Sequence, residues 1–111
     1  MEFATTEREN CHVIAVSGRI DSYTSPNLEE ELDTLLAAGH CNIIMDFSNV
    51  SYLSSSGMLA LINAEKKCLI QDRGKVLLAN VPGQVLSSLK LAGFDQIFDI
   101  FPDVNTALGQ F

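Results

Sequence analysis

The chain has 111 residues, of which 47% are hydrophobic and 19% are charged, a composition typical of a folded domain and too apolar for a disordered chain. Seven Lys and Arg residues stand against fourteen Asp and Glu residues, so the net charge is −7. Such a chain is repelled by nucleic-acid phosphates and by anionic membrane surfaces, and we expect it to bind neither directly. The length suits a single domain, which we expect to span residues 1–111.

The three cysteines are odd in number and widely spaced, and each of the two histidines lies next to a cysteine. These residues are Cys11, His12, His40, Cys41 and Cys68. No C-x-x-C pair is present and no further pair completes a zinc set, so we expect reduced thiols and neither a metal nor another cofactor. The polar, acidic start of the chain and the lack of a long apolar run favour a cytoplasmic protein.

Apolar periodicity and turn residues predict strands and helices that alternate along the chain. The predicted strands cover residues 3–8, 11–16, 41–45, 75–79 and 97–101, and the predicted helices cover residues 26–38, 58–72, 82–92 and 103–108. Helices between strands imply right-handed parallel crossovers, and the first two strands form a hairpin around Glu9-Asn10. We therefore predict an α/β domain with a mixed, mostly parallel sheet of about five strands, three to four helices and an N-terminal β-hairpin.

Local signals set three boundaries of this prediction. Ser17-Gly18 is expected to close the second strand. Ser25 is expected to be the N-cap of the first long helix. Residues 46–53 are expected to form a loop-like connection, in which Asp46 caps the turn that follows it.

The feature that most needs explanation is the run Ser54-Ser55-Ser56-Gly57, which precedes a helix that is apolar nearly all round at its start. We expect such a helix to be covered on more than one side. One serine hydroxyl is enough to cap a helix start, so the run is either a redundant cap or presents one hydroxyl as a phosphoacceptor. A phosphate there would add about −1.5 to −2 charges at the positive end of the helix dipole, which tolerates them.

The chain lacks the motifs of three classes of protein that could be considered for these residues. A hydrolase elbow needs G-x-S-x-G, but Ser54 stands where the first glycine would be. A response-regulator receiver would need an acidic pair beside Asp46, and residues 11–17 supply none. No Walker sequence or G-x-G-x-x-G is present. We therefore expect that the protein is not an enzyme, and a small enzyme with Ser56 as nucleophile is the least favoured alternative.

Three segments of the chain form a recognisable set. They are Gly18-Arg19-Ile20-Asp21, Asp46-Phe47-Ser48-Asn49-Val50-Ser51-Tyr52-Leu53-Ser54-Ser55-Ser56-Gly57, and Leu89-Lys90-Leu91-Ala92-Gly93-Phe94. This set resembles the STAS domain family, and more narrowly the bacterial anti-sigma-factor antagonists. The resemblance covers nearly the whole chain, and the central segment is its most specific part.

The resemblance implies a mechanism of partner switching. In that family the unmodified antagonist binds an anti-sigma factor, itself a serine kinase of the histidine-kinase-like ATPase fold, and so frees a sigma factor for RNA polymerase. The kinase phosphorylates the second serine of an Asp-Ser-Ser-Gly motif, which releases the antagonist, and a metal-dependent phosphatase of the PP2C type restores it. For this chain the resemblance implies Ser56 as the phosphoacceptor, with Ser55 as the second choice.

The same resemblance implies a partner-binding surface around the serines. Its residues would be Asp21, Ser54, Ser55, Ser56, Gly57 and Met58. Asp21 corresponds to an acid of the family and Met58 would be an apolar anchor, although Asp21 could equally be an ordinary turn residue and Met58 a core residue.

Ser54 stands where the family usually has Asp, so the chain lacks one carboxylate and gains a third hydroxyl. This difference keeps a second hypothesis open, in which the domain is a constitutive scaffold or accessory subunit, as in stressosomes or lipid-transport ATPases. At a net charge of −7, a monomer is the expected state.

Overall fold

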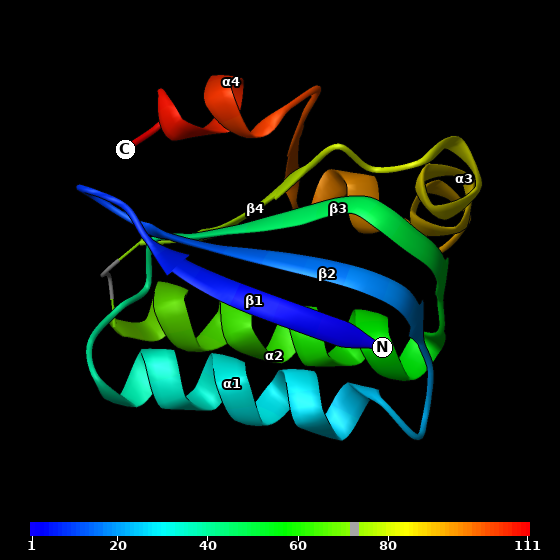
Figure 1. The fold of residues 1–111 in the computed structure, drawn as a ribbon, viewed down its shortest axis with the longest axis horizontal. Coiled ribbons are helices and arrows are strands. Elements are labelled where there is room, and N and C mark those ends of the chain that lie inside the picture. The colour runs from blue at the N-terminus through cyan, green and yellow to red at the C-terminus, as the bar shows by residue number, and fades with distance from the viewer. Residues whose placement is uncertain (72–73) are drawn as a thin grey trace.

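A five-stranded sheet forms the middle of the molecule, and helices lie on both sides of it (Figure 1). The computed structural model describes residues 1–71 and 74–111. In sheet order, the strands are β1 (Glu2–Glu7), β2 (His12–Ile20), β3 (Ile43–Leu53), β4 (Val76–Ala79) and β5 (Asp99–Phe101). β1 is antiparallel to β2, and the other neighbouring strands are parallel. The predicted single α/β domain, with its mixed, mostly parallel sheet and N-terminal hairpin, is therefore confirmed.

Two long helices, α1 (Ser25–Ala37) and α2 (Ser55–Gln71), lie side by side against one face of the sheet (Figure 1). The main core lies between these helices and the sheet, where Ile14, Phe47 and Leu61 are fully buried. The remaining helices are α3 (Gly83–Leu91), the short 3-10 helix η1 (Phe94–Gln96) and α4 (Val104–Leu108). α4 lies on the other face, over a smaller core (Figure 1). Among the described residues, no helix is long and apolar enough to cross a membrane.

β3 is longer than predicted, because residues 46–53 belong to it and make up most of its 11 residues. The expectation of a loop-like connection is therefore wrong. Its buried side chains Phe47, Val50 and Leu53 recur at every third residue rather than every second. Two irregularities in the β2–β3 register explain this spacing, since each of them adds one residue to β3.

Asp46 has a structural role in this bulged strand. Its Oδ1 accepts hydrogen bonds from the Ser48 N–H (3.1 Å) and from Asn80 Nδ2 (3.1 Å). The Ser48 N–H lies at the first register irregularity, where one β3 residue lacks a partner on β2. Asp46 thus caps a bulge within a strand rather than the turn that was predicted.

Two further boundary predictions are wrong. Ser17-Gly18 does not close β2, which continues to Ile20. Gly18 has φ +89° and lies at the second irregularity, so this glycine marks a bulge instead of a strand end. Ser25 is the first residue of α1, and the N-cap position belongs to Thr24, whose side chain makes no capping hydrogen bond.

α2 starts three residues earlier than predicted and is hydrogen-bonded to the start of β4. Its predicted end at Asp72 lies outside the described residues. Glu65 is buried in this helix, and its Oε2 accepts a hydrogen bond from the Val76 N–H at 3.0 Å, where β4 begins. Burial raises the pKa of Glu65, and the hydrogen bond from Val76 offsets only part of that shift.

All three cysteines are buried thiols, as predicted. Burial raises the pKa of Cys11, and burial together with contact with Cys41 raises the pKa of Cys68 to about 12. The Cys68 thiol points at the Cys41 carbonyl, with a distance of 3.7 Å between sulfur and oxygen. With their pKa values raised, the Cys11 and Cys68 thiols stay protonated at neutral pH and act as small apolar residues.

Candidate functional site

The serine run lies where β3 ends and α2 begins, at the edge where the parallel strands have their carboxyl ends (Figure 1). Only Ser54 separates the strand from the helix. The Ser54 N–H donates a hydrogen bond of 2.8 Å to the carbonyl of Ile20, the last residue of β2. This bond holds the serine run against the loop that contains Asp21. In open α/β sheets, ligands bind outside this same edge.

Ser54 is the N-cap of α2. Its Oγ accepts a hydrogen bond from the Gly57 N–H (3.2 Å), and its carbonyl accepts one from the Met58 N–H (3.0 Å). The hydroxyl thereby satisfies one of the N–H groups that a helix start leaves without a partner. The structural interpretation of the run is therefore correct for its first serine, and the other two serines still need an explanation.

Ser55 and Ser56 are the first two residues of α2. Ser55 is exposed to solvent and Ser56 is half-buried. Both hydroxyls lie at the positive end of the dipole of a 17-residue helix. A phosphate on either serine would be stabilised electrostatically by the helix that carries it.

Gly57 lets the start of α2 pack closely against the ends of β2 and β3. A Cβ atom at Gly57 would stand 2.7 Å from Ile20 Cγ2 and 2.7 Å from Leu53 Cδ1, closer than real Cβ atoms approach other atoms. The next residue, Met58, is 7% exposed and belongs to the main core. Both residues thus lie beneath the surface, and the position of Met58 favours its interpretation as a core residue over that as an apolar anchor.

Asp21 organises the loop between β2 and α1. Its Oδ1 accepts hydrogen bonds from the N–H groups of Tyr23 (3.0 Å) and Thr24 (3.1 Å), and its own N–H donates to Thr24 Oγ1 (2.8 Å). Desolvation raises the pKa of Asp21, but the hydrogen bonds from Thr24 and Tyr23 outweigh it and hold that pKa below its ordinary value. The Asp21 carboxylate is therefore charged at neutral pH and fixed beside the serine run.

Two exposed apolar side chains that the sequence did not single out lie at the same edge. Tyr23 follows Asp21 in the loop and is 91% exposed. Leu59 is 57% exposed and lies one helical turn after Ser55, on the same face of α2. We expected the start of this helix to be covered on more than one side. In the isolated chain, that expectation is wrong at Leu59, whose side chain is exposed. Exposed aromatic and aliphatic residues that gather beside polar groups are typical of protein contact surfaces.

A charged side chain, Arg19, lies next to Asp21 at this edge of the sheet. The Arg19 guanidinium lies over the Tyr52 ring, 4.3 Å from its centroid, and Arg19 Nε is 3.9 Å from Asp21 Oδ2.

We give one name, the switch surface, to the residues that meet at this edge: Asp21, Tyr23, Ser54, Ser55, Ser56 and Leu59. Sequence reasoning found its polar members, while Tyr23 and Leu59 emerged only once the helix start and the loop were placed in space.

Comparison with known proteins gives a consistent result. The STAS domain family model matches residues 2–107. The anti-sigma-B factor antagonist of Staphylococcus aureus (strain NCTC 8325 / PS 47) is 27% identical over 100 residues, which are 90% of this chain and 92% of the relative. The crystal structure of an anti-sigma factor antagonist from Mycobacterium paratuberculosis superposes with a TM-score of 0.88 at 26% identity, covering 98% of this chain and 92% of that chain.

A second solved structure shares the fold at lower identity. It is that of the Bacillus cell fate determinant SpoIIAA in its phosphorylated form, with a TM-score of 0.77 and 16% identity, covering 98% of both chains.

Proposed function

The chain belongs to the STAS domain family, and from this we propose that it is an anti-sigma-factor antagonist controlled by serine phosphorylation. In its unphosphorylated form it binds an anti-sigma factor and thereby frees a sigma factor for transcription. The observation that carries this proposal is the switch surface, where two serines at a helix start lie beside the exposed Tyr23 and Leu59. Relatives named as anti-sigma factor antagonists match along nearly the whole chain, which supports the same role.

Phosphorylation of Ser56 is the proposed switch, with Ser55 as the second choice. A phosphate is a dianion, and at the start of α2 it would be tolerated by the helix while changing the surface that faces the partner. Burying that charge against apolar partner groups is unfavourable, so the complex separates. The phosphorylated form of SpoIIAA, which shares this fold, supports the idea that the fold accepts such a group.

The proposed partners follow from this switch. A serine kinase of the ATPase fold, which is also the anti-sigma factor, adds the phosphate, and a PP2C-type phosphatase removes it. The chain itself acts as a cytoplasmic, monomeric binding module without catalytic activity. Reaction of Ser56 with a fluorophosphonate probe would contradict this non-enzymatic role.

Ser54 supports a second candidate function. It caps α2 as a carboxylate would, but it places no negative charge next to the acceptor serines. A kinase that recognises this position through a basic side chain would bind the chain less well. A constitutive scaffold or accessory subunit, which is never phosphorylated, is therefore the alternative. A pull-down that recovers a transporter ATPase or a large homotypic assembly, instead of an anti-sigma kinase, would favour it.

Phosphorylation of matched variants tests the switch. The protein is incubated with its cognate kinase and ATP, and intact mass spectrometry counts the phosphates added. We expect one phosphate on the wild type and on Ser55→Ala, and none on Ser56→Ala. Normal phosphorylation of Ser56→Ala would refute the assignment of the acceptor, and an unmodified wild type would favour the scaffold.

Binding of the partner tests the consequence of the added charge. Ser56→Asp is compared with Ser56→Asn, which has nearly the same shape and no charge, by calorimetry against the anti-sigma factor. We expect the aspartate to weaken binding by about 1–3 kcal/mol more than the asparagine does. Equal affinities of the two variants would show that charge at this position does not control the complex.

A further inference from the structure

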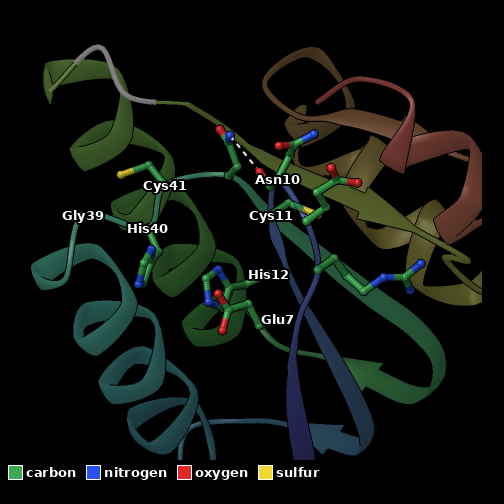
Figure 2. Close-up of a pocket in the computed structure, with 10 residues that line it drawn as sticks. Glu7, Asn10, Cys11, His12, Gly39, His40 and Cys41 are labelled. Atoms are coloured by element: carbon green, nitrogen blue, oxygen red, sulfur yellow. Dashed lines mark hydrogen bonds between the residues drawn. The ribbon is translucent and has the colours of Figure 1, made fainter.

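The two histidines of the chain meet in one pocket (Figure 2). The pocket lies where β2 and β3 begin, at the edge of the sheet opposite the switch surface. His12 is the first residue of β2, and His40 precedes β3. The two imidazole rings have centroids 4.4 Å apart, and their planes are tilted by 35°. The two imidazole rings are therefore in contact with each other, although they come from distant parts of the sequence.

Backbone hydrogen bonds fix the positions from which both rings extend. The His40 N–H donates to the Leu35 carbonyl (2.9 Å), and Gly39, with φ +85°, reverses the chain at the end of α1. The His12 N–H donates to the Asn42 carbonyl (2.9 Å). The two ring positions are thus set by a helix end and by the pairing at the start of β2.

The pocket around the rings is polar and open to solvent. Its volume is about 260 Å³, which is room for an ion and several water molecules of about 30 Å³ each. Glu7 lies directly opposite His12 in the β1–β2 hairpin, and Glu9 also lines the pocket. With Arg8 as the only guanidinium among the residues that line it, the pocket has a small excess of negative charge, which favours a cation.

We propose that His12 and His40 together bind a divalent transition-metal ion, for which Zn²⁺ is the probe. Neutral imidazole is a good ligand for ions of this class. Two nitrogens that bind one Zn²⁺ at about 2.0–2.1 Å are about 3.3 Å apart, a separation that rings in contact can reach by a small rotation. His40 is exposed, so its ring is free to make that rotation.

Water completes the coordination of the ion in this site. Among the residues that the structure describes, no three His, Cys, Asp or Glu side chains are already arranged to hold a metal. The neighbouring Cys11 and Cys41 are buried, and Figure 2 shows the sulfur of Cys41 pointing away from the two rings. The site therefore resembles an open site with exchangeable positions, and not a closed structural zinc site with four protein ligands.

Calorimetric titration of the untagged protein with Zn²⁺, in a buffer that does not chelate metals, tests this proposal. We expect one Zn²⁺ per chain, and a loss of at least about tenfold in affinity in His40→Asn and in His12→Asn. His40→Asn is the decisive variant, because its exposed side chain can be changed without disturbing the core. Glu9→Gln is the comparison variant, because it removes one negative charge from the same pocket and leaves both imidazoles in place. We expect it to weaken Zn²⁺ binding by less than either histidine variant does.

Zn²⁺ bound by the rings also shifts the proton resonances of both imidazoles, which a ligand elsewhere would not do. An absence of saturable binding up to about 1 mM Zn²⁺ would overturn the proposal, as would wild-type affinity in folded His40→Asn. Ser56→Ala should bind Zn²⁺ like the wild type, so this proposal can fail or hold independently of the proposed switch.

Discussion

Replacement of Ser54 by alanine removes the side-chain cap of α2 and leaves the rest of the helix unchanged. The bond that is lost is the one from the Gly57 N–H to Ser54 Oγ, at 3.2 Å in a partly buried position. Loss of such a cap costs about 1 kcal/mol, within a range of about 0.5–2 kcal/mol. For a domain of this size, that lowers the melting temperature by roughly 4 °C. We therefore expect Ser54→Ala to be folded but measurably less stable.

The matched variant is Ser54→Asp, which restores the residue type usual in the family. Its carboxylate accepts the same hydrogen bond, and its charge at the helix start contributes about 0.3–1 kcal/mol. We expect it to be at least as stable as the wild type. Urea denaturation followed by circular dichroism gives the free energies of unfolding, provided that the m-value stays constant. The reasoning fails if Ser54→Ala unfolds like the wild type, or if Ser54→Asp is as unstable as Ser54→Ala.

Three further variants test the packing at the start of α2, the contact surface and the buried carboxyl group of Glu65. Gly57→Ala should lower the free energy of unfolding by about 1–3 kcal/mol, since its Cβ meets two core side chains, whereas Gly83→Ala, which meets nothing within 4 Å, should not destabilise the protein in the same urea titration. Leu59→Ser should weaken binding of the proposed anti-sigma partner by more than about 1 kcal/mol. Leu69→Ser, which changes another exposed leucine at the far end of α2, should bind like the wild type in calorimetry. Burial raises the pKa of Glu65 in the folded state above its unfolded value, so its contribution to stability is present at low pH and is lost as the pH rises through the folded pKa. When the pH is lowered from neutral to mildly acidic, the free energy of unfolding should therefore rise less in Glu65→Gln than in the wild type. Identical pH profiles of urea unfolding for the two proteins would contradict this assignment.

The order of elements could be predicted because most of them follow simple periods. The leucines of α1 lie at helical spacing, and the apolar run at the start of β3 is long enough to indicate a buried strand. Residues 46–53 of β3 were missed because two bulges change the spacing of buried residues from two to three. Such a pattern is set by pairing with β2, and a single segment of sequence does not contain that information.

Only the polar residues of the candidate site were predicted from the sequence, because the position of its apolar residues depends on the three-dimensional structure. Ser54, Ser55 and Ser56 stand out as a run, but which apolar neighbour faces the core depends on where the helix begins. α2 begins at Ser55, and this phase turns Met58 inward and Leu59 outward. An error of a few residues in the start of a helix therefore exchanges a core residue for a surface residue.

The anchoring of α2 determines what a phosphate on it can do in the proposed switch. The helix is capped by Ser54, packs through Gly57 against two strand ends, and is bonded to β4 through Glu65. A charge added at its exposed start is too weak to move a helix held at so many points, because a favourable interaction with the helix dipole is worth at most about 2 kcal/mol. The phosphate must then act locally, on whatever covers Tyr23 and Leu59. In the proposed switch, the partner therefore contacts the start of α2 directly, and the helix keeps its place when the phosphate is added.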